Sequence, residues 1–339
     1  MFGWLRPKAA SAATIAVDGP AANEPASTVD PDRLLRRLEW TVLRRLDGVL
    51  QGDYRTLFRG FGLDLADLRE YQLHDDVRYI DWNVTARVQV PHVREFQEDR
   101  EVAAWFVLDL SGSVDFGSQQ LRKRALASEL VAVLARLFTR YGNRVGAVLH
   151  SDHGSEIVPA RSGRLHVLRI LDRMQKLAER RARPSPTAVG RITDLAELLK
   201  LARPVIKRRS VLFVVSDFIS TPGWSRALSD LARRHDIVAV RLTDPMETEL
   251  PDIGLVVMQD AETGEQLLVD THDRAFRQRF ARAAERRETE LRAALGDAGV
   301  DCLELATDEP LDEALLRFTQ LRKRRRQLAT GALPKHMRT

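Results

Sequence analysis

The chain has 339 residues, of which 44% are hydrophobic and 30% are charged, and its formal net charge is +5. This length allows one large α/β domain with additions or two domains of ordinary size, and the composition excludes collagen-like, low-complexity and wholly disordered proteins. Since no apolar run reaches the roughly 18 residues that a membrane-spanning helix needs, and since the single cysteine excludes an internal disulfide, we expect a globular cytoplasmic protein.

The beginning of the chain is rich in Ala, Ser, Thr and Pro and shows no amphipathic period, which predicts a disordered lead over residues 1–29. A signal peptide is the alternative, because Arg6 and Lys8 precede an Ala-rich stretch, although that stretch is only weakly apolar. A helix is predicted next, with Asp30 as its N-cap and Pro31 at its first helical position. Apolar residues then recur at helical spacing for about twenty residues.

Between Gly52 and Arg100 we expect short extended segments separated by polar turns, including residues 77–82 and 88–96. Residues 30–100 are therefore predicted to form an N-terminal helix followed by a β-rich addition. The addition carries a cluster of charged residues around an indole, formed by Arg78, Asp81, Trp82 and Arg87. The cluster either docks a partner or packs the addition against the main sheet through Trp82 with its charges paired, and we favour packing.

Strand-like apolar runs alternate with helical patterns from Glu101 onward. Strands are predicted at residues 102–109, 144–150, 211–217, 237–242 and 300–305. Helices are predicted at residues 119–140, 164–177, 224–234 and 273–295, after Thr193 and from Leu311, with Gly296 ending the fourth. This alternation is typical of a Rossmann-like α/β fold, a doubly wound and mainly parallel sheet with helices on both faces. Residues 254–258 and 266–269 are expected to add a hairpin to this domain, which is predicted to span residues 101–321.

A basic tail is predicted over residues 322–339. It begins with five adjacent cations, Arg322, Lys323, Arg324, Arg325 and Arg326. Their combined charge equals the net charge of the whole chain. We therefore expect no basic face spread over the fold and no specific nucleic-acid binding. The tail could bind a polyanion or an anionic membrane surface, but the simpler interpretation is a solubilising helix end.

The predicted strand that ends at Asp109 continues into the motif Asp-x-Ser-x-Ser, formed by Asp109, Ser111 and Ser113. In an open α/β sheet, ligands bind in the crevice beyond the carboxyl ends of the strands, where these side chains leave the sheet. Carboxylate and hydroxyl oxygens are hard donors that suit Mg²⁺ or Mn²⁺ and suit zinc or copper poorly. The remaining donors are therefore expected on neighbouring loops.

Two further oxygen-bearing residues follow in the expected order. Thr193 opens a helix after a Pro-containing loop, and Asp217 ends the second buried strand. Each alone could be a helix cap or a turn residue. Together with the Asp-x-Ser-x-Ser residues they resemble the metal-ion-dependent adhesion site of von Willebrand factor type A domains. Arg191 and Ile192 stand where such domains often have two glycines, and Thr187 is the alternative ligand.

The segment before the metal motif is similar to the signature of the bacterial domain-of-unknown-function family 58. The resemblance rests on residues 71–87, on residues 93–96 and on the Val-Ser-Asp-Phe sequence at the end of the second buried strand. It covers roughly residues 30–325. The resemblance implies a von Willebrand factor A-like fold with an N-terminal β-rich addition. It also implies work with a MoxR-type AAA+ ATPase in a chaperone-like or maturation role.

A carboxylate from a partner is expected to complete the metal site. Asp109 and Asp217 balance the charge of one divalent ion, which leaves the ion able to bind a further anionic oxygen. A metal-dependent hydrolase is the alternative, although the sequence has no His-Glu-x-x-His, Gly-x-Ser-x-Gly or Gly-x-x-x-x-Gly-Lys motif. His150 and His153 lie near the expected metal rim, and we interpret them as ordinary loop histidines. We therefore predict a non-enzymatic interaction module that binds a MoxR-type ATPase or a client protein.

Overall fold

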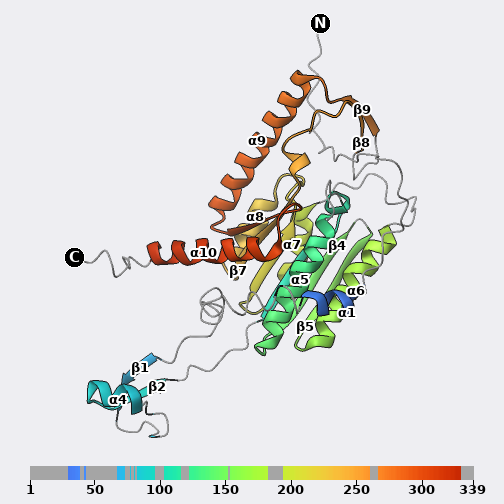
Figure 1. Ribbon diagram of the computed structural model, residues 1–339. Helices are drawn as coiled ribbons and strands as arrows, with labels where there is room; N and C mark the ends of the chain where they lie inside the picture. Colours follow the sequence, from blue (N-terminus) through green and yellow to red (C-terminus); the bar gives the residue numbers. More distant parts are fainter. Residues whose placement is uncertain are drawn as a thin grey trace, which may run out of the picture.

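A six-stranded sheet forms the centre of the described part of the chain (Figure 1). The computed structural model describes residues 30–38, 42, 67–72, 77, 80, 82–95, 103–115, 122–151, 153–181, 194–259 and 266–329. In spatial order the strands are β10 (Asp301–Ala306), β7 (Asp236–Thr243), β6 (Val211–Ser216), β3 (Ala103–Asp109), β4 (Arg144–Ser151) and β5 (Gly154–Arg161). The predicted lead over residues 1–29 lies outside the described residues.

The sheet is mainly parallel, as predicted. β3 lies between β4 and β6 and runs parallel to both, with Leu108 opposite Leu149 and Val215. β6 pairs in parallel with β7, and β7 pairs in parallel with β10. β5 alone runs antiparallel, against β4, and was not expected from the sequence. Most of its residues are exposed or half-buried and only Val158 is buried, as befits a strand at the edge of the sheet.

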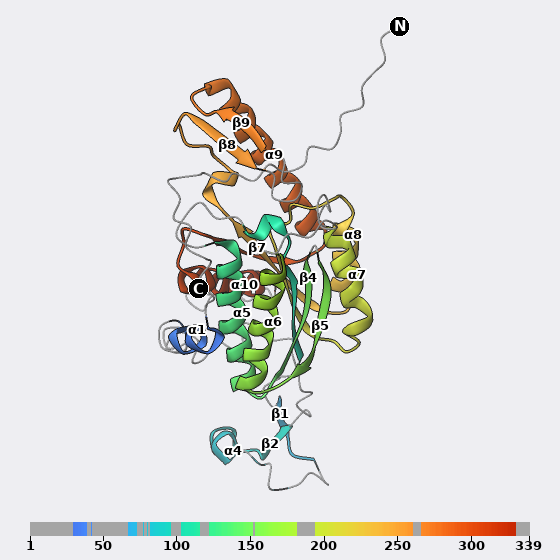
Figure 2. The same ribbon diagram turned by 90° about the vertical axis from the view of Figure 1, so that its right-hand side faces the viewer.

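Helices cover both faces of the sheet, which confirms the doubly wound α/β fold (Figure 2). One face carries α1 (Pro31–Leu38), α5 (Lys123–Arg140), α6 (Arg164–Arg181) and α10 (Leu311–Ala329). The other face carries α7 (Leu195–Val205), α8 (Trp224–Ala232) and the end of α9 (Arg274–Asp297). None of the helices in the described residues combines the length and the apolar character that crossing a bilayer requires.

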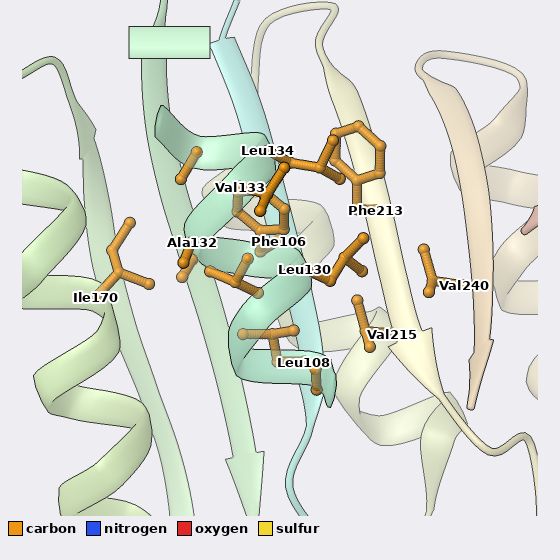
Figure 3. Packing of buried hydrophobic residues seen from close by; sticks show 14 of the residues in the cluster. Phe106, Leu108, Leu130, Ala132, Val133, Leu134, Ile170, Phe213, Val215 and Val240 are labelled. Atoms are coloured by element: carbon orange, nitrogen blue, oxygen red, sulfur yellow. The ribbon is translucent and has the colours of Figure 1, made fainter. Parts of the chain in front are cut away.

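Strand β3 supplies both halves of the core because its side chains alternate between the two faces. Phe106 and its neighbours on one face pack under α5, while Trp105 and Val107 pack against α7 and α8. The ring of Phe106 stacks on Phe213 of β6 at 5.3 Å, and Phe138 of α5 meets Phe213 edge-on at 5.9 Å. Figure 3 shows Phe106 and Phe213 side by side beneath α5. This packing holds the carboxyl ends of β3 and β6 next to each other.

The predicted hairpin forms a separate two-stranded sheet of β8 (Leu255–Gln259) and β9 (Gln266–Asp270). One face packs Val256, Met258 and Val269 against Phe276 and Phe280 of α9. The opposite face leaves three large apolar side chains exposed, Leu255, Val257 and Leu268. Both views show the hairpin and α9 projecting from the main sheet (Figures 1 and 2).

The N-terminal addition differs from its predicted form. β1 (Asp67–Glu70) and β2 (His92–Glu95) pair antiparallel, as a β-rich segment should. The residues between the two predicted extended segments, where a turn was expected, form the helix α4 (Trp82–Val88). Trp82 is 69% exposed, which overturns the interpretation that its indole packs the addition against the main sheet. Arg78 and Asp81 lie outside the described residues, and Arg87 is exposed.

Two aspartates cap helix starts, whereas the predicted helix end at Gly296 is displaced. Asp30 caps α1, since its Oδ1 accepts a hydrogen bond from the amide of Asp32 at 3.0 Å. Asp273 caps α9 in the same way through the amide of Ala275. Gly296, however, lies inside α9 instead of ending it, and Gly299 takes the left-handed conformation beyond the helix, with φ +65°.

Helix α10 runs through the predicted start of the basic tail without a break. Arg322 is only 5% exposed, and its Nη2 donates to both carboxylate oxygens of Asp236 at 2.7 and 2.8 Å. Its Nε lies 2.9 Å from Oδ2 of Asp301, which Arg325 also contacts. Arg322 therefore ties α10 to the starts of β7 and β10. It belongs to the folded domain and is not a free tail cation.

Replacing Arg322 with Ala is expected to lower the free energy of unfolding by about 2 to 4 kcal/mol, because two carboxylates lose a buried partner. Arg324→Ala, at an exposed position of the same helix, should change it by less than about 0.5 kcal/mol. Urea unfolding followed by circular dichroism compares the two variants. Equal midpoints would contradict a structural role for Arg322.

Candidate metal centre

The Asp-x-Ser-x-Ser residues converge at the carboxyl end of the central strand. Asp109 ends β3, Ser111 lies in the turn that follows, and Ser113 lies in the short helix η3 (Gly112–Asp115). The hydroxyls of Ser111 and Ser113 are 3.2 Å apart, and the amide of Ser111 donates to Oδ1 of Asp109 at 3.0 Å. All three side chains are at least 96% buried. The turn thus directs a carboxylate and two hydroxyls to one point.

Strand β6 brings a second carboxylate to the same point. The hydroxyl of Ser216 donates to Oδ2 of Asp109 at 2.8 Å, so the ends of β3 and β6 are joined by a side-chain hydrogen bond. Asp217 follows directly and is 3% exposed. Its Oδ1 accepts a hydrogen bond from the amide of Ile219 at 3.0 Å. Phe218 takes φ +59° between them, and its ring packs edge-on against Trp224 at 5.2 Å.

We use the term candidate metal centre for Asp109, Ser111, Ser113 and Asp217. The Ser111 amide donates to Oδ1 of Asp109, the Ser216 hydroxyl donates to Oδ2, and the Ser111 hydroxyl also hydrogen-bonds this carboxylate. The two oxygens of a carboxylate together have about four acceptor positions. The three hydrogen bonds therefore orient the carboxylate and leave it capacity to bind a cation.

The electrostatics of the centre show a shortage of positive charge. Burial and, to a lesser extent, the nearby charge of Asp217 raise the pKa of Asp109 from 3.8 to about 7. Hydrogen bonds from Ser111 and Ser216 only partly oppose this shift. A bound cation would relieve both the burial of charge and the repulsion between the two carboxylates. The buried oxygen donors and this unmet charge together fit a small divalent cation.

A buried lysine and a glutamate adjoin the centre, and the sequence analysis did not identify them. Lys123, at the start of α5, is 0% exposed, and its Nζ lies 3.4 Å from Oδ2 of Asp217. The same Nζ contacts Oε1 of Glu247, which ends the short helix η4 (Pro245–Glu247) after β7. Oε2 of Glu247 accepts a hydrogen bond from the amide of Asp244 at 3.3 Å.

The lysine stays charged in this buried position. Burial lowers the pKa of Lys123, but the charges of Asp217 and Glu247 outweigh it, so the net shift is upward. Burial raises the pKa of Glu247, and the charge of Lys123 opposes that shift. A lysine in the first turn after the Asp-x-Ser-x-Ser loop was the available signal, but a charged residue at a helix start is normally placed in solvent.

The predicted threonine ligand lies outside the described residues, as does Thr187. The helix that Thr193 precedes begins beside the centre, because the amide of Leu195 donates to the hydroxyl of Ser220 at 2.9 Å. Ser220 belongs to the loop that follows Asp217. Asp194 caps α7 through the amide of Ala196 at 2.9 Å. The participation of Thr193 stays a prediction.

The two histidines near the expected rim lie in β4 and in the turn that follows it. His150 lies in β4, not in a loop, and its Nδ1 is 2.8 Å from the hydroxyl of Ser155 across the hairpin. His153 lies in the turn between β4 and β5. Within the described ranges, no three or more His, Cys, Asp and Glu side chains form a group that could hold a metal ion. The candidate centre instead combines two carboxylates with two hydroxyls.

Comparison with known proteins gives one family and several relatives. The family model described as "Protein of unknown function DUF58" matches residues 67–290. Uncharacterized protein Rv1480 of Mycobacterium tuberculosis is 38% identical over 302 residues, which are 89% of this chain and 91% of that protein. Uncharacterized protein MAV169 of Mycobacterium avium is 36% identical over 168 residues, which are 49% of this chain and 94% of that protein.

Solved structures give weaker likenesses. An aerotolerance-related membrane protein from Bacteroides fragilis is 14% identical with a TM-score of 0.41, covering 66% of this chain and 99% of that chain. The SpRpn10 VWA domain is 11% identical with a TM-score of 0.34, covering 63% of this chain and 93% of that chain. With TM-scores this low, the fold assignment rests on the sheet topology and not on these structures.

The raised pKa of Asp109 predicts how the metal-free protein responds to pH. Folded Asp109 holds its proton up to about pH 7, whereas the unfolded chain releases it near pH 3.8. The unfolded state is therefore increasingly favoured as pH rises through this window, and the contribution of Asp109 to stability falls. The side chain introduced by Asp109→Asn cannot ionise, so the free energy of unfolding of this variant should not decrease in this way as pH rises.

Urea unfolding in EDTA at about pH 5 and about pH 8 measures this contribution as the difference between wild type and Asp109→Asn. The wild type is expected to lose stability relative to the variant at the higher pH. The same pH dependence in both proteins would contradict the burial of an ionisable Asp109.

Proposed function

The chain belongs to the DUF58 family of proteins of unknown function, and we propose that it is a metal-dependent protein-interaction module without enzymatic activity of its own. One observation carries the proposal: two buried carboxylates and two hydroxyls converge at the carboxyl edge of the sheet with too little positive charge beside them. Asp109, Ser111, Ser113 and Asp217 would hold Mg²⁺ or Mn²⁺, and Thr193 is the fifth predicted ligand. A bound divalent ion supplies a coordination position for an anionic oxygen.

The chain's own residues set up the recognition. The Ser111 amide and the Ser216 hydroxyl orient the Asp109 carboxylate, and the Ile219 amide orients Asp217. The side chains are pre-positioned, so little conformational entropy is lost when a ligand arrives. The group that completes the site is a Glu or Asp side chain of a partner protein. The resemblance noted from the sequence makes a cytoplasmic MoxR-type AAA+ ATPase, or a client of that ATPase, the first partner to test.

The basic tail offers less support for binding a polyanion or a membrane surface than its composition suggests. Arg322 is buried against Asp236 and Asp301, and Arg325 also contacts Asp301. Two of the five cations in the run are therefore already neutralised by acidic residues. Residues 330–339 lie outside the described residues.

The metal requirement is testable directly. Asp109→Ala is expected to lower the affinity for Mn²⁺ by about 100-fold or more, since it removes a ligand and not only a supporting contact. Asp230→Ala, which changes an exposed aspartate of α8, is the matched control and should bind as wild type does. Titration calorimetry on EDTA-treated protein measures both. Equal affinities for wild type and Asp109→Ala would contradict the proposal.

The partner is tested by affinity capture from native lysate with wild type and Asp109→Ala, each in Mg²⁺ and in EDTA. An AAA+ ATPase or a defined client retained only by wild type in Mg²⁺ is the expected result. The same retained proteins in all four samples would contradict a carboxylate bridged through the ion. Turnover of phosphate or ester substrates that needs Mg²⁺ and disappears in Asp109→Ala would favour the hydrolase alternative instead.

A further inference from the structure

A buried ion-pair chain runs from the candidate metal centre into the body of the protein. Oδ2 of Asp217 lies 3.4 Å from Nζ of Lys123, and that Nζ contacts Oε1 of Glu247. The side chains of Lys123 and Asp217 are fully buried, and that of Glu247 is 18% exposed. Three elements meet here: the loop after β6, the start of α5 and the helix η4 after β7.

The formal charges in this chain have a specific sum. Asp109, Asp217 and Glu247 contribute three negative charges, and Lys123 contributes one positive charge. The net charge of −2 is equal and opposite to that of one divalent cation. Without Glu247, Lys123 would leave a net charge of −1, and without Lys123 the three carboxylates would leave −3. Electrostatic interactions act strongly across such a buried group, so each change alters the attraction for a cation.

Lys123 and Glu247 also determine the geometry of Asp217. One oxygen of the Asp217 carboxylate faces the amide of Ile219 and the other faces the ammonium of Lys123. Glu247 holds that ammonium in turn, and its second oxygen is bound to the amide of Asp244. The ammonium is therefore fixed from two sides and cannot turn away to solvent.

We infer that Lys123 and Glu247 are the positioning residues that set the charge of the metal centre, Lys123 lowering its affinity for a divalent cation and Glu247 restoring it. This inference rests on the proposed function, because it concerns the same centre. It assigns opposite roles to two residues that a purely structural ion pair would make equivalent. The pair thus adjusts the centre to bind a cation reversibly.

The test uses three variants of similar side-chain size: Lys123→Met, Glu247→Gln and the double variant. Mn²⁺ affinity is measured by calorimetry on the full-length, EDTA-treated protein. Lys123→Met is expected to bind Mn²⁺ about tenfold or more tightly, and Glu247→Gln about tenfold or more weakly. The double variant restores the net charge of −2 and should return to within about threefold of wild type.

Three outcomes overturn the inference. The first is that both single variants weaken Mn²⁺ binding, the second that neither changes it, and the third that the double variant is weaker than each single variant. Glu247→Asp keeps the charge and should bind Mn²⁺ as wild type does, which separates charge from packing. If Lys123→Met does not fold, the Glu247→Gln variant by itself tests the inference. Mn²⁺ binding by this variant that is unchanged or tighter than in wild type contradicts the inference.

Failure of the proposed function gives a different result. Wild type that binds no Mn²⁺, or that binds it as Asp109→Ala does, overturns the metal centre itself and this inference with it. Wild type that binds Mn²⁺ in an Asp109-dependent way, with equal effects of the two single variants, overturns only the roles assigned to Lys123 and Glu247.

Discussion

Two like charges buried at the ends of neighbouring parallel strands are the constraint on which the rest of the structure depends. Asp109 and Asp217 are almost completely buried, and the charge of Asp217 adds to burial in raising the cost of ionising Asp109. The surrounding groups reduce that cost: amide and hydroxyl donors face Asp109, and an amide and an ammonium face Asp217. Burying two carboxylates among apolar groups alone would be costly, which explains why amide and hydroxyl donors and the Lys123 ammonium surround them.

The parts of the fold predicted well from the sequence are those governed by local pattern. Strands β3 and β6 are continuous apolar runs bounded by polar residues, which is typical of a strand buried on both faces. Their positions placed Asp109 and Asp217 at the same sheet edge, and hydrogen bonds now join the two strand ends. Helix α4, between the two predicted extended segments, was not predicted, because β-branched residues such as Val84 and Thr85 favour strands by propensity, which tertiary context can outweigh.

The remainder of the centre could not be predicted, because it depends on contacts between distant residues. Lys123 and Glu247 are 124 residues apart in the chain, and no spacing rule joins them. A lysine is among the residues least often buried, so its place in the first turn of α5 suggested solvent exposure. Arg322 was placed in the tail because it begins a run of five cations, although aspartates at the starts of β7 and β10 bury it. Long basic side chains reveal their role only once their carboxylate partners are located.

The parallel pairing of β3 with β6 has a consequence for how the protein folds. Asp109 and Ser216 are 107 residues apart, so pairing their strands closes a long loop, which costs conformational entropy. The cluster of charges therefore exists only once these strands have paired. A cation that bound this cluster as proposed would stabilise the folded state and not the unfolded chain, so it would lengthen the lifetime of the folded protein.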